Sequence, residues 1–390
     1  MAGDLHPSST HPPLPPTTED IRFHHLRLLR SRRVGPSTYH RLLREHGCVH
    51  RALEALPDIA AKAGVPKYEM CPEGVIWAEL KAGKRAGAKL LVFGHEGYPA
   101  SLAEMSDAPP LLWCIGDNAI LKQPAIAMVG ARNASALGTR MATSLAKDLN
   151  SQGYVIVSGL ARGIDAAAHH ASLENGTIAV QAGGVDVIYP SENAELAARI
   201  AKKGLRLSEQ PMGMQPMARH FPARNRIIAG LARACVLVEA AHKSGSLITA
   251  RDALDLGRDV MAVPGHPFDA RASGCNMLIR DGAVLVRRAE DVIEALGPIS
   301  PQVLEKLQDG QPVTDRMADF TPFPTRIPKA ADPSDLHALI LGQLGPSPVP
   351  EDHLLRLLPA GSDDVAPVLT EMELHGQITR HAGGLLSRTA

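Results

Sequence analysis

This sequence of 390 residues has few aromatic residues, no formal net charge and no closely spaced pair of cysteines. Aromatics make up only 3% of the chain, which argues against an extended base-stacking surface. The 41 Lys and Arg residues balance 41 Asp and Glu residues, so a polyanion would need a local basic patch. The five cysteines are scattered and form no C-x-x-C pair, which disfavours a disulfide framework or a structural zinc site. A reducing cytoplasm therefore fits best.

Long apolar runs are also missing. None approaches the roughly 20 residues that span a bilayer, so we expect no membrane segment. Residues 1–19 are rich in Pro, Ser and Thr and lack the apolar core of a signal peptide, which predicts a disordered lead-in. The hydrophobic fraction of 45% and the charged fraction of 21% are those of a soluble globular protein long enough for two or three domains.

Residues 20–89 are predicted to form a small helical domain. Leu26 and Leu29, and then Leu42 and Leu43, recur at helical spacing on either side of a "VGPS" break. This outline also fits a SAM-like or helix-hairpin-helix unit, whose turn amides can meet DNA phosphates. We favour the simpler interpretation, a helical packing domain.

Residues 90–297 show the pattern of an α/β domain. Short branched runs alternate with helical stretches, and most of the runs end in glycine: "LLVFG", "AIAMVG", "YVIVSG", "TIAVQAGG", "ACVLVEA" and "DVMAVPG". Continuous apolar strands between helices indicate a buried parallel sheet. We therefore predict an extended Rossmann-like, doubly wound fold, in which ligands bind beyond the carboxyl ends of the strands.

The remaining chain is predicted to contain a linker and a last small domain. Residues 298–334 are Pro-rich and poorly periodic, as in a linker. Residues 335–390 are expected to form three helices and two short strands, "GQITRH" and "GLLSR", in winged-helix order. Because the third helix, "DDVAPVLTEMELHG", is acidic, we favour packing or protein interaction over DNA reading for this domain.

The turn "VGARNASALG" follows the second apolar run. It places Arg132 where a dinucleotide fingerprint would have glycine, and the next strand ends without Asp or Glu. A cation on a glycine turn suits a phosphate and not a ribose diol, so NAD binding is disfavoured.

The turn "SGLARGIDAAAHHA" offers a second anion cradle. Ser158 and Gly159 supply hydroxyl and amide donors before a helix N-terminus, and Arg162 is expected to assist from the rim. Ser158 has no G-x-S-x-G elbow, so a nucleophile is disfavoured. His169 and His170 are consecutive and point about 100° apart on a helix, so they cannot chelate one metal together. We expect both histidines to pack.

The segment Arg219–Arg233 carries four arginines and no acidic residue. Arginine forks match phosphates and an aromatic ring can stack a base, which suits a single strand better than a duplex. The binding residues expected here are Phe221, Arg224, Asn225 and Arg226.

A fourth turn, "EAAHKSGSLITARDA", is rich in hydroxyls and amides at the start of a helix, with Lys243, Ser244, Gly245, Ser246 and Thr249. It does not match G-x-x-x-x-G-K-[ST], so ATP hydrolysis is unsupported. Asn276, in a later loop, is expected at the rim of the same edge.

Four phosphate-type turns on one sheet edge exceed what a mononucleotide needs, so we predict binding of single-stranded nucleic acid without catalysis, cofactor or metal. Two alternatives stay open. One is a nucleotide-processing enzyme of phosphoribohydrolase type, and the other is an adaptor whose terminal domains hold partners.

The motifs also resemble those of the DprA/Smf family of DNA-processing proteins. The matching stretches, in order, are "GARNASALG", "SGLARGID", "GGVDVIYP", "SEQP", "FPARNRIIAGL", "VEAAHKSGSLITA", "GRDVMAVPG" and "GCNMLIRDGA". The resemblance covers roughly residues 94–296. One departure is "GAR" where many members have "GSR", which removes a hydroxyl beside Arg132.

The resemblance implies an extended Rossmann fold, a homodimer, sequence-independent binding of single-stranded DNA, protection of incoming strands, and loading of the RecA recombinase in natural transformation. Related nucleotide hydrolases carry P-G-G-x-G-T-x-x-E where this chain has "SGSLITARDA", so their catalytic set is absent here. The DNA pocket implied by the resemblance includes Arg132, Ser158, Gly159, Asn225, Arg226, Lys243, Ser246 and Thr249.

Overall fold

The computed structural model describes residues 18–299 apart from 64 and 66, together with residue 307 and short stretches between 339 and 388. Almost all of the predicted lead-in and nearly all of the predicted linker lie outside these residues. The chain divides into two compact units, Met1–Met317 and Ala318–Ala390, which are described separately.

The first unit begins with four helices, as the sequence predicts: α1 (Thr18–Arg30), α2 (Pro36–His46), α3 (Val49–Lys62) and α4 (Glu73–Arg85). Gly35 precedes α2 in an extended conformation and Pro36 takes its first position, where a missing amide costs nothing. A core around Leu42, Leu53 and Tyr39 joins α1, α2 and α3. A second core, which includes Phe23 and Trp113, joins α1 and α4 to the sheet. The helical part and the sheet therefore share buried contacts.

The sheet has nine strands in the order β1-β2-β6-β5-β4-β3-β7-β8-β9. From β6 to β9 every pair is parallel, whereas β2 is antiparallel to both β1 and β6. The strands are β1 (Lys89–Val92), β2 (Leu111–Gly116), β3 (Ala125–Gly130), β4 (Val155–Ser158), β5 (Thr177–Val180), β6 (Leu205–Ser208), β7 (Ala234–Glu239), β8 (Asp259–Ala262) and β9 (Val284–Leu285). All six predicted runs are strands, while β2, β6 and β9 were not predicted.

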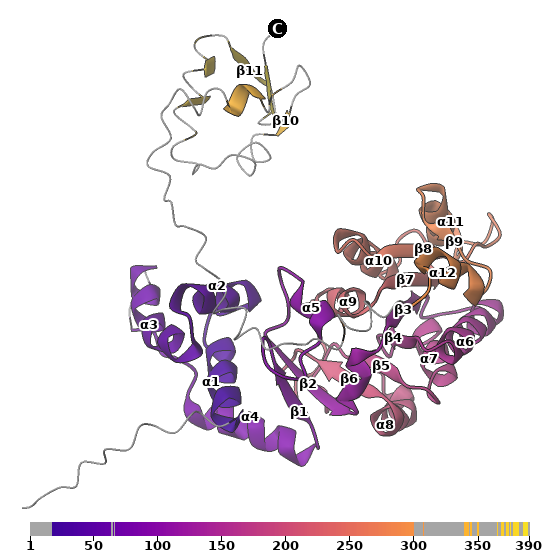
Figure 1. Ribbon diagram of the computed structural model, residues 1–390, viewed down its shortest axis with the longest axis horizontal. Coiled ribbons are helices and arrows are strands. Elements are labelled where there is room, and N and C mark those ends of the chain that lie inside the picture. The colour runs from indigo at the N-terminus through magenta and orange to yellow at the C-terminus, as the bar shows by residue number, and fades with distance from the viewer. Residues whose placement is uncertain are drawn as a thin grey trace, which may run out of the picture. The chain divides into compact units, whose positions relative to one another are not determined.

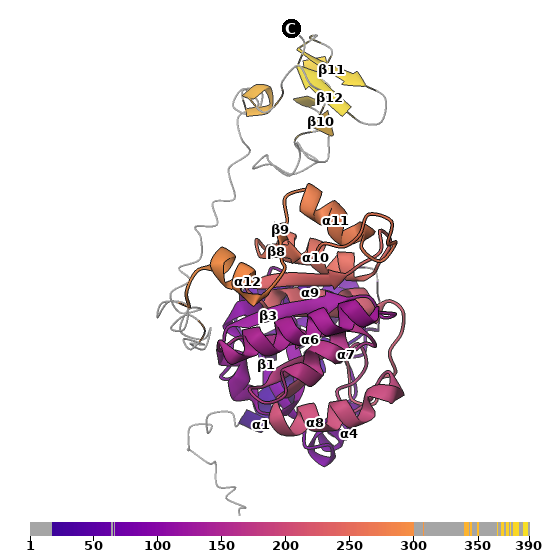
Figure 2. The same cartoon turned by 90° about the vertical axis from the view of Figure 1, so that its right-hand side faces the viewer.

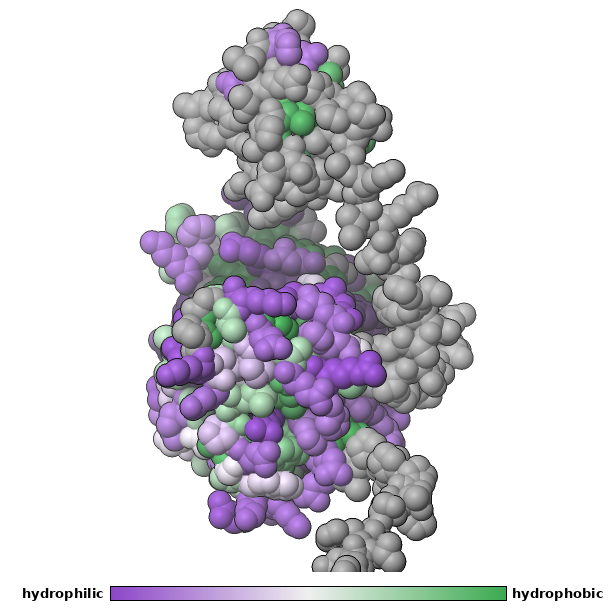
Figure 3. All heavy atoms as spheres, turned by 90° about the vertical axis from the view of Figure 1, so that its left-hand side faces the viewer, coloured by the Kyte–Doolittle hydropathy of each residue, from purple (hydrophilic) through white to green (hydrophobic). Residues whose placement is uncertain are grey.

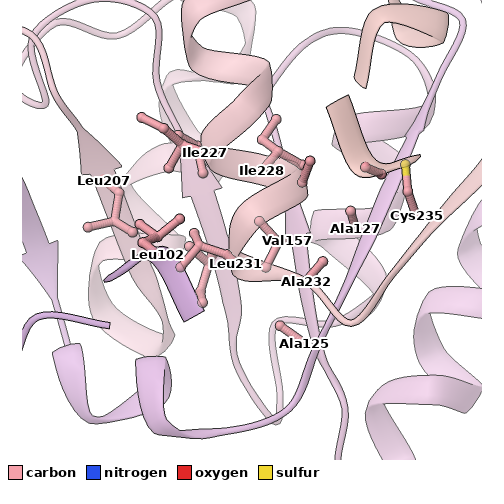
Figure 4. Packing of buried hydrophobic residues seen from close by; sticks show 14 of the residues in the cluster. Leu102, Ala125, Ala127, Val157, Leu207, Ile227, Ile228, Leu231, Ala232 and Cys235 are labelled. Atoms are coloured by element: carbon pink, nitrogen blue, oxygen red, sulfur yellow. The ribbon is translucent and has the colours of Figure 1, made fainter. Parts of the chain in front are cut away.

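Helices cover both faces of this sheet (Figures 1 and 2). The core of one face includes Val157 of β4 together with Ile227 and Leu231 of α9, which packs on that face (Figure 4). The core of the other face includes Ile126, Leu145 and Val292. The helices are α5 (Ala100–Ala103), α9 (His220–Leu231), α10 (Ser246–Asp255) and α11 (Ser273–Arg280) on the first face, and α6 (Ala136–Ser151), α7 (Ile164–Ala171), α8 (Ala194–Lys203) and α12 (Ala289–Leu296) on the other, with 3-10 turns η1 (Asn118–Lys122) and η2 (Ser191–Asn193). The predicted doubly wound fold is confirmed, with an antiparallel extension at one edge.

Strand order reverses at β3. The chain leaves β3 for β4 on one side, and after β6 it returns to β7 on the other. In open α/β sheets the crevice at such a switch point, outside the carboxyl ends of the strands, is the usual ligand site. The loops after β3, β4, β5 and β7 meet at that edge.

The second unit contains a three-stranded sheet in the order β10-β12-β11, from Val349–Pro350, Leu385–Arg388 and Ile378–His381. The last two strands form the predicted hairpin, and Ile340, Leu369 and Leu386 contribute to a core of their own. The complete course of the three predicted helices lies outside the described residues. Across both units, none of the described helices is long and apolar enough to cross a bilayer.

Candidate nucleic-acid interface

Arg132 and two aromatic rings come together at the edge formed by β3, β5 and α9. The Arg132 guanidinium lies over the ring of Phe221, 5.2 Å from its centroid. Tyr189, which follows β5, meets Phe221 edge to face at 6.0 Å and is 52% exposed. Arg132 is exposed and has no acidic partner among the described residues. Side chains from two loops and from the start of α9 thus form a surface with one unpaired cation and two rings, which we call the aromatic cluster.

Beneath the aromatic cluster lies a small pocket. Its lining includes Tyr189 and Phe221 at the mouth, and Gln181, Arg224 and Gly159 inside. Gln181 is 4% exposed; its amide nitrogen donates to the Val187 carbonyl at 2.7 Å, but its Oε1 has no partner. The Nε of Arg224 is likewise buried without an acceptor. Buried polar atoms are normally paired, whereas these two have no protein partner beneath the cluster.

Arg224 is held by the backbone of the strand ends. Its Nη1 donates to the Val180 carbonyl at 2.8 Å, and a Cβ at position 159 would lie 1.8 Å from that nitrogen. Burial lowers the pKa of Arg224 to about 10, while the carboxylate of Asp165 opposes this shift. Gly159 is therefore needed for close approach, as predicted, but the approaching group is an arginine of the same chain.

Backbone amides in the turn after β4 are hydrogen-bonded to a side chain of the helix that follows, α7. The Asp165 carboxylate accepts from the amides of Gly159 at 3.0 Å and Ala161 at 3.3 Å. Burial raises the pKa of Asp165, and Arg224 and these two amides oppose that effect. Ser158 is fully buried and donates to the Met128 carbonyl at 2.6 Å. The geometry gives Ser158 and the Gly159 amide structural roles instead of the phosphate contacts that the sequence suggested.

His169 packs inside α7, as expected. It is fully buried, its Nε2 accepts from the Leu160 amide at 3.3 Å, and its Nδ1 lies 2.8 Å from the Thr177 hydroxyl. Burial lowers its pKa to about 3, so the ring is neutral. His170 is exposed on the same helix.

The switch-point crevice contains a carboxylate that sequence reasoning missed. Glu239, at the end of β7, accepts from the Ser135 amide at 2.9 Å and from the Ser135 hydroxyl at 2.5 Å. A Cβ at Gly138 would lie 2.4 Å from the Glu239 carboxyl carbon. Ser135 caps α6, so Glu239 occupies the position at which a dinucleotide phosphate meets the helix N-terminus.

Two predicted arginines are engaged elsewhere. Arg226 donates to the Asp107 carbonyl at 2.8 Å and to the Glu209 carboxylate, and its side chain is 16% exposed. Arg162 pairs with Glu192 at 2.5 Å on the surface. Arg226 is therefore a largely buried cation with structural partners, which differs from the DNA contact expected from the sequence.

The loop before α10 lies at the end of β7, beside β3. Lys243 is exposed and has no acidic partner in the part of the chain that the structure describes. The hydroxyls of Ser244 and Ser246 pair with each other at 2.7 Å. Thr249 is buried, contrary to the prediction of a contact residue.

The last three predicted residues differ in their hydrogen bonding and exposure. Asn276 uses both ends of its amide on the backbone of Gly265, at 3.1 and 2.9 Å. Asn225 is half-buried on α9, four residues after Phe221, and Gly245 is exposed. Within the described residues, no three His, Cys, Asp or Glu side chains gather as metal ligands would.

The chain contains a Rossmann-like α/β body, with a helical part before it and a winged-helix part after it. One edge of the body is cationic and aromatic, and the carboxylates of Asp165 and Glu239 occupy its phosphate-type turns. Family models agree with each part. Residues 89–297 match DNA recombination-mediator protein A, residues 19–82 match the DprA-like N-terminal HHH domain, and residues 324–384 match the DprA winged helix domain. The chain belongs to the DprA/Smf family of DNA-processing proteins.

Individual relatives support this assignment. DNA processing protein DprA of Streptococcus pneumoniae is 48% identical over 198 residues, which cover 50% of this chain and 70% of that protein. Protein Smf of Escherichia coli is 38% identical over 307 residues, or 76% of each chain. The solved structure of the S. pneumoniae protein is 35% identical with a TM-score of 0.53, covering 67% of this chain and 98% of that one. That of Helicobacter pylori DprA, described as revealing a single-stranded DNA binding mode, is 31% identical with a TM-score of 0.50, covering 54% and 95%.

Proposed function

We propose that this protein binds single-stranded DNA without sequence preference and without catalysis. The observation that carries the proposal is the aromatic cluster over a pocket with unpaired polar atoms. Phe221 and Tyr189 offer ring faces that any base can stack on, and Arg132 offers a cation free for a phosphate.

Charge around the cluster favours a strand over a mononucleotide. Arg132 and Lys243 follow the neighbouring strands β3 and β7, and Arg219 precedes Phe221 at the start of α9; all three are exposed. The crevice between β3 and β7 already holds the Glu239 carboxylate, which repels a phosphate at the α6 N-terminus. Phosphates are therefore held by side chains along the rim, where successive nucleotides can follow one another.

The relatives support the same activity, since H. pylori DprA is described as binding single-stranded DNA. From the family resemblance we extend to this chain the protection of incoming strands and the loading of RecA in natural transformation, and from its scattered cysteines a cytoplasmic location. A homodimer is supported by β9, an edge strand whose Val284 and Leu285 are 39% and 42% exposed. An uncovered apolar edge is a template for pairing with a second copy.

The alternative function is that of a phosphoribohydrolase, for which the site has no available carboxylate among the described residues. The carboxylates near the edge, Asp165 and Glu239, are already bonded to backbone amides. Release of free base from a nucleoside monophosphate, followed by chromatography, tests this alternative directly, and turnover would replace the proposal.

The test of binding is fluorescence anisotropy with labelled oligo-dT across a salt series. Phe221→Ala should weaken binding about tenfold, since each stacked base contributes about 1–3 kcal/mol. Arg132→Ala should weaken it and reduce the salt slope by about 1. Arg162→Ala removes an exposed arginine already paired with Glu192 and serves as the matched control. Unchanged affinity in both cluster variants would disprove the pocket assignment.

A further inference from the structure

The segment that contains α1, the turn after it and α2 is the most cationic part of the sequence. Residues 21–44 contain no Asp or Glu, although the whole chain has no net charge. The same stretch holds seven arginines: Arg22, Arg27, Arg30, Arg32, Arg33, Arg41 and Arg44. This concentration exceeds that of the Arg219–Arg233 segment and lies in a different part of the fold.

Only some of these arginines form ion pairs that hold the helices together. Arg27 and Arg30 pair with Glu73 and Glu79 of α4, at 2.8 and 2.9 Å, and thereby fix α1 on α4. Arg32 and Arg33, at the tip of the turn, are exposed and pair with no carboxylate among the described residues. The face of the molecule over these helices is largely hydrophilic (Figure 3).

The tip is held rigidly by its backbone, which leaves both side chains free. The Val34 amide donates to the Ser31 carbonyl at 3.1 Å, and the Tyr68 hydroxyl donates to the Arg32 carbonyl at 2.6 Å. Arg33 is in the left-handed conformation, with φ 63°. Such a conformation is unfavourable for a residue with a side chain, and glycine would adopt it at lower cost.

Further donors surround the tip. Lys67, next to Tyr68, is exposed, and Glu69 is the acidic residue closest to it in sequence. At the start of α2 no side chain caps the helix and the first turn has no acidic residue. The amides of Ser37 and Thr38 donate to no acceptor within the described part of the chain. Cations and directed amide donors together suit phosphate oxygens.

The described residues of this turn present no fully exposed aromatic ring, which decides the kind of nucleic acid that fits. Tyr39 is buried in the helical core, and Tyr68 is half-buried with its hydroxyl bound to the backbone of the tip. Binding of a single strand gains from base stacking on aromatic side chains, whereas a duplex presents only its backbone to such a surface. We propose that the α1–α2 turn, with Arg32, Arg33 and Lys67, is a second nucleic-acid site that binds the phosphate backbone of duplex DNA.

This site differs in location and chemistry from the aromatic cluster. The aromatic cluster would hold a single strand and the α1–α2 turn the adjoining duplex, so a tailed duplex should bind more tightly than either part alone. That last step rests on the proposed function; the duplex site does not.

The experiment compares full-length variants on a blunt duplex and on oligo-dT of the same length. Arg32→Gln with Arg33→Gly removes both charges, and glycine tolerates the left-handed conformation, so the fold is kept. We expect duplex affinity to fall about tenfold or more, the duplex salt slope to fall by about 2, and oligo-dT affinity to stay unchanged. Lys147→Gln with Lys202→Gln removes two exposed charges from α6 and α8 and is the matched control.

Each other outcome overturns the proposal. Unchanged duplex affinity would make the turn a solvated face, and an equal loss on both probes would make it an extension of the single-strand site. Arg132→Ala with Phe221→Ala should give the reverse pattern, with oligo-dT binding lost and duplex binding kept. Failure of that second pattern alone would count against the proposed function and leave the duplex site standing.

Discussion

Arg224 and Arg226 lie two residues apart on α9, and each is bound by a different part of the fold. Arg224 points to the Val180 carbonyl beneath the aromatic cluster, while Arg226 reaches Asp107 and Glu209. Both come from the acid-free segment that predicts phosphate contacts. Asp165 near Arg224, and Asp107 and Glu209 beside Arg226, supply the negative charge that the local sequence lacks.

Arg226→Ala should therefore act on stability. Glu209 is 14% exposed at its side chain, and removal of one member of a buried pair costs about 3 kcal/mol because the other charge stays unpaired. Oligo-dT affinity of the folded protein should change less than twofold. Urea unfolding measures the first quantity and anisotropy the second.

Arg162→Ala is the control for this stability effect, since its pair with Glu192 is about 60% exposed and should contribute less than about 1 kcal/mol. An Arg226→Ala protein with unaltered stability and lost DNA binding would restore Arg226 to the DNA site.

At the scale of elements, the central strands are the most predictable part of the fold. β3, β4, β5, β7 and β8 are short branched runs buried on both faces, so their composition alone marks them. β6 was missed because Arg206 interrupts its pattern, although that residue is only 8% exposed. β9 has two residues, too few for any period to show.

The binding edge was harder to predict than the strands that form it. Glycines after β4 were expected to admit phosphate, but Gly159 admits Arg224, and Gly163, with φ 73°, admits the carbonyl of Ala131. Glu239 acts on Ser135 across 104 residues, a contact that no local spacing could reveal. Arg132 and Phe221 were predicted individually, whereas their contact depends on the fold.

β9 carries the prediction on assembly. Leu285→Lys places a charge on the exposed edge strand and should convert a dimer to a monomer, because lysine on an edge opposes strand pairing. Light scattering coupled to size exclusion gives the molar mass. Val75→Lys, at an exposed apolar position on α4, is the matched control and should stay dimeric. A dimeric Leu285→Lys protein would place the interface elsewhere.

At the scale of the whole molecule, one buried histidine in the helical part and one beside the sheet should make stability depend on pH over the same range. His25 in α1 contacts the Tyr39 hydroxyl at 2.5 Å, and His169 in α7 contacts Thr177. Burial lowers the pKa of each to about 3, from an ordinary value of 6.5. Neither ring can accept a proton in place without loss of its surroundings.

Stability should therefore fall on acidification well before carboxylates titrate. A folded pKa below the unfolded one means that the full contribution is present above pH 6.5 and is lost as pH decreases toward 3. Between about pH 7.5 and 5.5 each histidine should lower the free energy of unfolding by about 1.4 kcal/mol, or about 3 kcal/mol together. Urea unfolding across this range measures the loss. His169→Gln should remove about 1.4 kcal/mol of the loss, while His242→Gln, at an exposed histidine, should leave it unchanged. A free energy of unfolding that does not change over this range in the wild-type protein would show that both rings are solvated and that their burial does not limit stability.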